Sequence, residues 1–116
     1  RRDPLDQGRV VSEPFARPGT TLCIVSLTYG ADLDAIDAAM SDHVDWLRAC
    51  YVEGRLIASG RKQPRTGGIV IAIGTRAEVE AMVSLDPFVA RGLATAEITP
   101  FTASMAALPL EDMLAS

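Results

Sequence analysis

The chain has 116 residues, of which 48% are hydrophobic and 22% are charged. This length and composition are typical of one soluble domain with a single core, and no segment approaches the roughly 18 uninterrupted apolar residues of a membrane span. The formal net charge is −4 and the densest basic stretch is the short run Arg61–Arg65. We therefore expect neither nucleic acid nor a membrane as a partner, but small molecules or other proteins.

Residues 1–19 form the first segment, which carries charges and three prolines but no continuous apolar stretch of the kind found in a secretory signal. We predict an arm or linker here. It is either a native extension that crosses to a second subunit or a remnant of recombinant expression, and the sequence leaves both open.

The first predicted strand is Thr20–Thr28, because it is rich in β-branched and apolar residues. A helix should begin after Asp32, whose carboxylate can cap free backbone N–H groups, and should end near Glu53, before Gly54. Along this helix, apolar residues recur at spacings of three and four, which predicts one buried face. That face consists of Leu33, Ile36, Met40, His43, Leu47 and Tyr51.

Two strands are predicted next, Arg55–Gly60 and Gly68–Gly74, joined by an exposed connection at residues 61–67. Thr75 and Glu78 have the spacing of a capping box, which predicts a second helix. Pro87 disfavours the helical conformation at the residue before it, so this helix should stop near Leu85.

The last predicted strand is Leu93–Phe101, and residues 102–116 form a tail in which Leu108–Leu114 is amphipathic enough for a short helix. The order of the elements is therefore βαββαβ. It predicts an α+β, ferredoxin-like fold: a four-stranded antiparallel sheet with two helices on one face. The other face would expose Ile71, Ile73 or their neighbours, so we expect a homodimer with face-to-face sheets, or a higher oligomer.

These residues and their order resemble the YciI-like family of the dimeric α/β barrel superfamily over residues 20–101. The resemblance is carried by His43 with Leu47, by the run 53–60 (EGRLIASG), by Gly67-Gly68, and by Asp86-Pro87-Phe88 followed by Gly92. It implies that His43 and Asp86 lie close together in a pocket beside the sheet. Many relatives have a proline where this chain has Arg61, so the resemblance does not fix the substrate.

His43 is the one histidine of the chain, and the helical pattern puts it among apolar residues. A buried imidazole needs hydrogen-bond partners, since each unsatisfied group costs roughly 1 to 3 kcal/mol. A carboxylate from Asp86 would fix the tautomer, favour the protonated form and leave the other ring nitrogen free for general acid/base chemistry. The alternative is a structural pair that ties the helix to the loop.

Ser59, Arg61 and Arg65 are further candidates for binding a substrate. Ser59 can add a hydroxyl to the site or can be purely structural. Arg61 and Arg65, together with Lys62, can bind an anionic substrate, because guanidinium groups match carboxylates, or can form a solvated hairpin.

Metal and nucleotide sites are not expected. Cys23 and Cys50 have no spacing motif, only His43 could join them as a nitrogen ligand, and free thiols are compatible with a reducing cytoplasm, where we expect the protein. The Gly67-Gly68 pair lacks the Lys-Ser/Thr that follows the glycines of a phosphate loop.

The resemblance and the His43–Asp86 pair together favour a cofactor-independent enzyme that performs isomerisation, elimination or dehydrohalogenation of a small organic substrate. The alternative is a non-catalytic module that binds a small molecule or a protein. A haem or oxygen-dependent monooxygenase is a third possibility from the same superfamily, and the absence of a second histidine weakens it.

Overall fold

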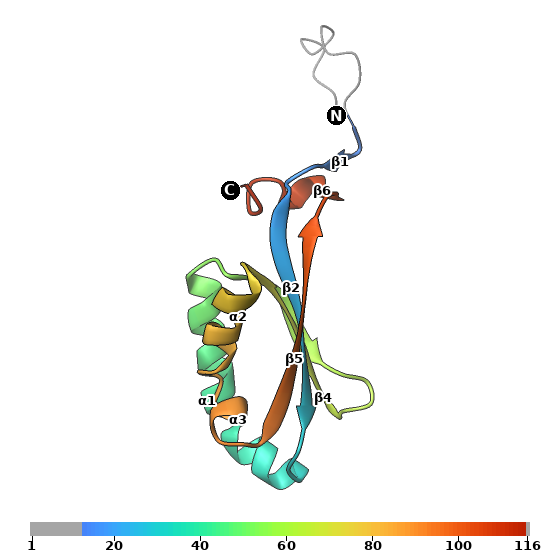
Figure 1. Cartoon of the computed structure of the whole chain (residues 1–116). Helices are drawn as coiled ribbons and strands as arrows, with labels where there is room; N and C mark the ends of the chain where they lie inside the picture. The colour runs from blue at the N-terminus through green and yellow to red at the C-terminus, as the bar shows by residue number, and fades with distance from the viewer. Residues whose placement is uncertain (1–12, 116) are drawn as a thin grey trace, which may run out of the picture.

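The computed structural model describes residues 13–115, and every strand and helix predicted between residues 20 and 103 is present in it (Figure 1). The main elements in chain order are β2 (Thr20–Tyr29), α1 (Leu33–Val52), β3 (Leu56–Arg61), β4 (Gly67–Ile73), α2 (Arg76–Val83), α3 (Pro87–Ala90) and β5 (Ala94–Ala103). The chain also contains the two-residue strands β1 (Phe15–Ala16) and β6 (Ala106–Ala107) and the 3-10 helix η2 (Leu108–Leu110).

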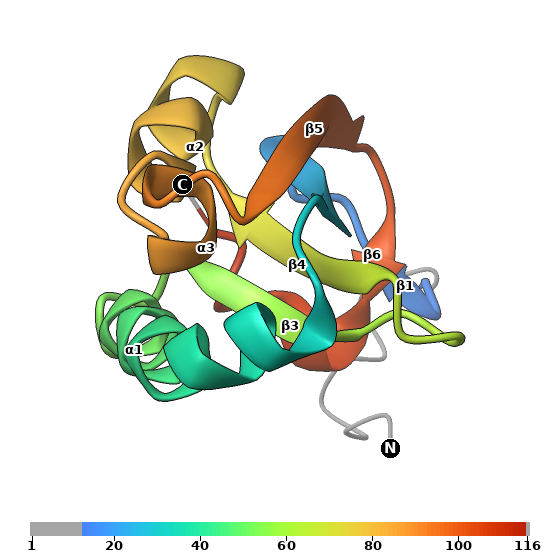
Figure 2. The ribbon, with the colours of Figure 1, turned by 90° about the horizontal axis from the view of Figure 1, so that it is seen from below.

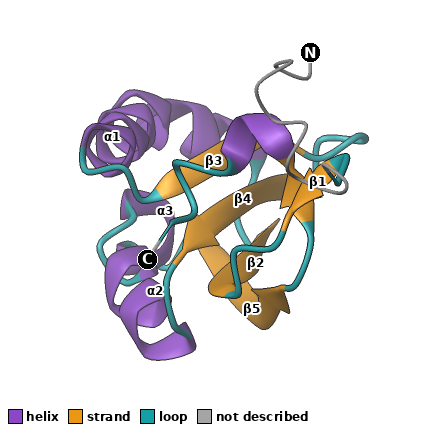
Figure 3. Ribbon diagram, turned by 90° about the horizontal axis from the view of Figure 1, so that it is seen from above, coloured by secondary structure: helices purple, strands orange, loops and turns teal. Residues whose placement is uncertain are grey.

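The four long strands form one antiparallel sheet in the order β3-β4-β2-β5. Strand β2 therefore lies between β4 and β5, which is the order that two split βαβ units produce. Helices α1, α2 and α3 all cover the same face of this sheet (Figures 2 and 3). The predicted α+β, ferredoxin-like fold is confirmed.

The main core lies between the sheet and the helices, and alternation along the strands selects its residues. On β2 the side chains of Cys23, Val25 and Leu27 are buried there, opposite Ala72, Val70 and Gly68 of β4. The capping box at Thr75 and Glu78 is present, and it starts α2 as predicted. The buried α2 residues are Val79, Met82 and Val83.

The predicted buried face of α1 is only partly correct. Ile36 and His43 are buried, but Leu33 is 44% exposed and Tyr51 is 41% exposed. These two residues lie in the end turns of α1, whereas the middle of the helix packs on α3 and β3. A spacing pattern identifies the face of a helix but not where the packing partner of that face ends.

Two boundaries differ from the prediction in a way that matters for the site. Arg61, predicted in the exposed connection, is the last residue of β3 and pairs with Gly68 of β4. Pro87, predicted only to stop the second helix, occupies the first position of a further helix, α3. Proline is well suited to that position because its missing N–H would be unpaired there anyway.

Strands β2 and β5 continue beyond the helices, and the terminal segments gather at that end of the sheet (Figure 1). There β1 pairs with β6, a short ribbon that no sequence pattern indicated, and Leu114 packs against Leu22 and Ala103. The helix predicted at Leu108–Leu114 is only the 3-10 helix η2 followed by a turn. Of the predicted arm, residues 1–12 lie outside the described residues.

No helix within residues 13–115 is long and apolar enough to cross a membrane. Helix α1 has the length, with 20 residues, but its sequence includes Asp34, Asp37, Asp42 and Asp45.

Gly67 sits at the closest approach of β4 to β2. A Cβ atom placed on Gly67 would lie 1.8 Å from the carbonyl oxygen of Leu27, far inside any van der Waals contact. Only glycine fits there, and the register of the β2–β4 pair depends on it. The Gly67-Gly68 pair therefore has a structural reason within the sheet.

We predict that Gly67→Ala lowers the free energy of unfolding by about 3 kcal/mol or more, because the backbone of β2 or β4 must shift to admit the methyl group. The measurement is urea unfolding followed by circular dichroism. Gly60→Ala is the matched control, since a Cβ there meets nothing within 4 Å. Equal stability of Gly67→Ala and Gly60→Ala would contradict the conclusion that only glycine fits at position 67.

Candidate functional site

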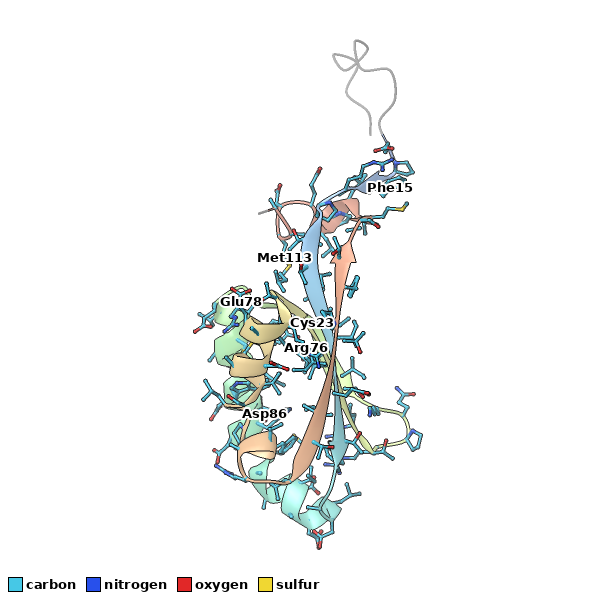
Figure 4. The ribbon with its side chains drawn as sticks, viewed as in Figure 1. Phe15, Cys23, Arg76, Glu78, Asp86 and Met113 are labelled. Carbon is cyan, nitrogen blue, oxygen red and sulfur yellow. The ribbon has the colours of Figure 1, made fainter. Side chains whose placement is uncertain are left out.

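His43 and Asp86 form a hydrogen-bonded pair inside the protein. The Nδ1 atom of His43 lies 2.8 Å from Oδ1 of Asp86, although 43 positions separate the two residues. Asp86 is fully buried and His43 is 9% exposed. The fold thus brings together the two residues that the resemblance placed in one pocket, His43 from the middle of α1 and Asp86 from the turn between α2 and α3. Asp86 is labelled at that turn in Figure 4.

Asp86 is held in place because it is the N-cap of α3. Its Oδ1 also accepts a hydrogen bond of 3.0 Å from the backbone N–H of Phe88, and Pro87 fixes the first helical position after it. The other carboxylate oxygen, Oδ2, is buried and has no hydrogen-bond partner within the described part of the chain. A single oxygen of Asp86 therefore caps α3 and binds His43 at once.

The imidazole of His43 is fixed in orientation by aromatic neighbours. The ring of Phe88 stacks on it with centroids 4.0 Å apart and an interplanar angle of 9°, and the ring of Trp46 lies 5.9 Å away. Trp46 is itself held by a 3.2 Å hydrogen bond from its Nε1 to the carbonyl of Met82. An ionised carboxylate only accepts hydrogen bonds, so Nδ1 of His43 carries a proton and Nε2 is the nitrogen available for other partners.

A cavity of about 230 Å³ lies next to His43, between α1, α3 and the sheet. Most of its lining is apolar, which is typical of small-molecule sites in which a few polar groups orient the ligand. The lining residues are Leu27, Tyr29, Met40, His43, Val44, Leu47, Ser59, Gly60, Arg61, Gly68, Ile69, Val70 and Phe88.

Two of the three predicted substrate-binding residues line this cavity. Ser59 and Arg61 alternate on β3, so both face the helix side of the sheet, opposite Val70 and Gly68. The hydroxyl of Ser59 forms a 2.8 Å hydrogen bond with the phenol of Tyr51. Ser59 and Arg61 thus both line the cavity from β3, the strand that faces α1.

Arg65, the third predicted residue, does not line the cavity. Its guanidinium pairs with Asp37 on α1, and this tethers the β3–β4 hairpin to the helix. The hydrogen bond from Arg65 holds the pKa of Asp37 below its usual value, and the charge of Arg61 acts in the same direction. The anion that Arg65 binds is therefore a side chain of the protein itself.

Phe88 is a residue of the site whose contact with His43 was not predicted from the sequence. Phe88 was noted only as part of Asp-Pro-Phe, yet it stacks on His43, and Tyr29 meets the ring of Phe88 edge-on at 5.9 Å. The position of Phe88, two residues after an N-cap aspartate, was the one available signal.

The arrangement offers acid/base chemistry at Nε2 of His43. Among residues 13–115 no group of three or more potential ligands could hold a metal ion. Burial raises the pKa of the thiols of Cys23 and Cys50, which disfavours the nucleophilic thiolate form. The one described buried pair of ionisable side chains is His43 with Asp86.

Comparison with known proteins supports the fold. The structure of 5-chloro-2-hydroxyhydroquinone dehydrochlorinase from Burkholderia phenoliruptrix AC1100, in complex with 2,5-dihydroxybenzoquinone, is similar, with a TM-score of 0.59 and 18% sequence identity. The match covers 67% of this chain and 90% of that chain. At this identity the likeness concerns the fold alone.

No curated protein matches the chain. The YCII-related domain, in contrast, matches residues 20–102. This range contains all three α-helices and the whole four-stranded sheet except Ala103. The chain belongs to the YCII-related domain family.

Proposed function

We propose that the chain is a cofactor-independent enzyme in which His43 transfers a proton to or from a small organic substrate and Asp86 orients it. The observation that carries this proposal is the 2.8 Å bond between Nδ1 and Asp86 beside a cavity that His43 lines. Because Nδ1 of His43 is hydrogen-bonded to Asp86, the lone pair of Nε2 is available to a ligand. A general base positioned in this way typically contributes a rate factor of about 10² to 10⁴.

The reaction step follows from the charges. Nε2 of His43 accepts a proton from an O–H or C–H group of the substrate, and the electron pair left behind forms a new double bond. In an elimination, a leaving group such as chloride departs with the electrons of its bond, so that the substrate loses HCl and no oxidant is needed. In an isomerisation, His43 returns the proton to another atom. Asp86 stabilises the imidazolium that forms in between.

Elimination of HCl is the first reaction to test, because the similar structure is that of a dehydrochlorinase. The cavity supports a single-ring substrate: an apolar cavity of roughly 150 Å³ is known to hold benzene, and this one has about 230 Å³. Leu47, Met40 and Val44 supply apolar contacts on the α1 side. Such a lining excludes water and strengthens the electrostatic effect of the His43–Asp86 pair.

The second candidate is a non-catalytic module that binds a small molecule. One observation favours it: Asp86 also caps α3 through the N–H of Phe88, so the carboxylate has a role in the fold without any chemistry. In that case His43 would be the partner that a buried carboxylate requires.

We also propose that the chain forms a homodimer through the sheet face that the helices leave open. Alternation directs Ile24 of β2 and Ile69, Ile71 and Ile73 of β4 to this face, and each is only partly covered. The C-terminal segment covers the end near Leu22 and Ile73 but not the middle of the sheet. A second sheet of the same kind, packed face to face, would bury the isoleucine row.

The buried free cysteines, Cys23 and Cys50, are compatible with a reducing compartment, and we propose a cytoplasmic location.

For the enzyme, His43→Gln should lower the rate of chloride release from 5-chloro-2-hydroxyhydroquinone by about 10²-fold or more, because glutamine keeps a donor for Asp86 but transfers no proton. A chloride electrode measures the rate. Asp45→Asn, an exposed change on the same helix, is the control and should leave it unchanged. An unaltered rate in His43→Gln, together with a lower melting temperature, would favour the binding module.

For the dimer, Ile71→Asp should convert the protein to a monomer, because it buries a charge at the centre of the proposed interface. Sedimentation velocity measures the mass. Val52→Asp is the matched control, since Val52 is highly exposed at the end of α1, and it should remain dimeric. A monomeric wild-type protein at concentrations of about 100 μM would refute this proposal, since a standard interface of about 800 Å² per partner usually binds more tightly.

A further inference from the structure

The side chain of Arg61 reaches the cavity from the strand that faces His43. It is the last residue of β3 and lies opposite Gly68, which has no side chain to stand in its way. Gly68 is itself confined, because a Cβ there would approach the carbonyl oxygen of Gly60 to 3.1 Å. The cavity thus has an acid/base group on the α1 side and a cation on the β3 side.

The charges around Arg61 do not balance. Three cations, Arg61, Lys62 and Arg65, occupy this hairpin, and among residues 13–115 the one carboxylate that pairs with any of them is Asp37, which is bonded to Arg65. Lys62 donates to the hydroxyl of Thr28, a neutral group. None of the described residues forms an ion pair with Arg61. Within the part of the chain that the structure describes, Arg61 therefore lies at the cavity without a salt bridge, and the charge nearest to balancing it is that of Asp37, which Arg65 already binds.

The remaining lining determines the shape of the ligand rather than its charge. Tyr29 and Phe88 meet edge to face and form an aromatic wall, and the other contacts are mostly aliphatic. Aromatic walls favour flat rings. Arg61 is exposed at the mouth of this cavity, where its planar guanidinium can bind an oxyanion through two parallel hydrogen bonds.

We infer that Arg61 binds an anionic oxygen group of the ligand, so that the site selects a flat, single-ring molecule carrying one negative charge. This inference rests on the proposed function in one respect, namely that the cavity beside His43 is the site. Arg61 is then the residue that determines specificity. Arg65 is a positioning residue, which holds the hairpin to α1 through Asp37 and leaves Arg61 free for the ligand.

The experiment compares benzoate with benzamide, two flat probes of the same size that differ in charge. Binding is followed by the fluorescence of Trp46, the one tryptophan of the chain, whose ring lies 5.9 Å from that of His43. Wild-type protein should bind benzoate at least about tenfold more tightly than benzamide, which corresponds to about 1.4 kcal/mol. Arg61→Gln should reduce this preference to about threefold or less.

Lys62→Gln is the matched control, since it removes the same charge from the same hairpin without changing the cavity lining. It should keep the preference for benzoate. The inference is overturned if wild-type protein shows no preference, if the preference survives Arg61→Gln, if Lys62→Gln removes it equally, or if neither probe binds at concentrations of about 10 mM.

A further variant separates this inference from the proposed catalysis. His43→Gln should keep the benzoate preference even where it abolishes chloride release, because Arg61 is unchanged. Lost turnover without any anion preference would leave the acid/base proposal standing and remove the role of Arg61. An anion preference that depends on Arg61, with turnover unaffected by His43→Gln, would support the role of Arg61 and contradict the acid/base proposal.

Discussion

The hydrogen bond between His43 and Asp86 joins the two halves of the helical layer. It connects the middle of α1 to the start of α3, and the stacked ring of Phe88 extends the same contact. Removing one partner of a buried hydrogen bond typically costs about 1 to 3 kcal/mol, and removal of Asp86 would also delete the N-cap of α3. The wall of the cavity next to His43 therefore depends on this one bond, whatever chemistry the bond supports.

Most of the fold could be predicted from the sequence because local signals agree with one another. Apolar runs mark the strands, a capping box at Thr75 and Glu78 starts α2, and Gly54 follows α1. The pairing of His43 with Asp86 was predictable for a different reason. A histidine in an apolar stripe needs a partner, and the family resemblance indicated which one.

The parts that could not be predicted depend on contacts between distant segments. A proline such as Pro87 can mark either the end of one helix or the first turn of the next. Only the position of Asp86 as an N-cap decides between these two interpretations. The ion pair of Asp37 with Arg65 joins residues 28 positions apart, with no local signal at either. For the same reason the sequence could not separate Arg61 from Arg65, although one lines the cavity and the other does not.

The use of a single carboxylate oxygen for two bonds has a consequence for how such a protein can diverge. Because Oδ1 of Asp86 serves both α3 and His43, a mutation of Asp86 that frees the His43 ring also removes the N-cap of α3, and selection for stability removes it. Substitutions in the β3–β4 hairpin should affect stability less, because Arg61 is exposed and contributes little to the core. The hairpin side of the cavity can therefore change among descendants of this chain at little cost in stability, while the pair of His43 and Asp86 is retained for the sake of the fold alone.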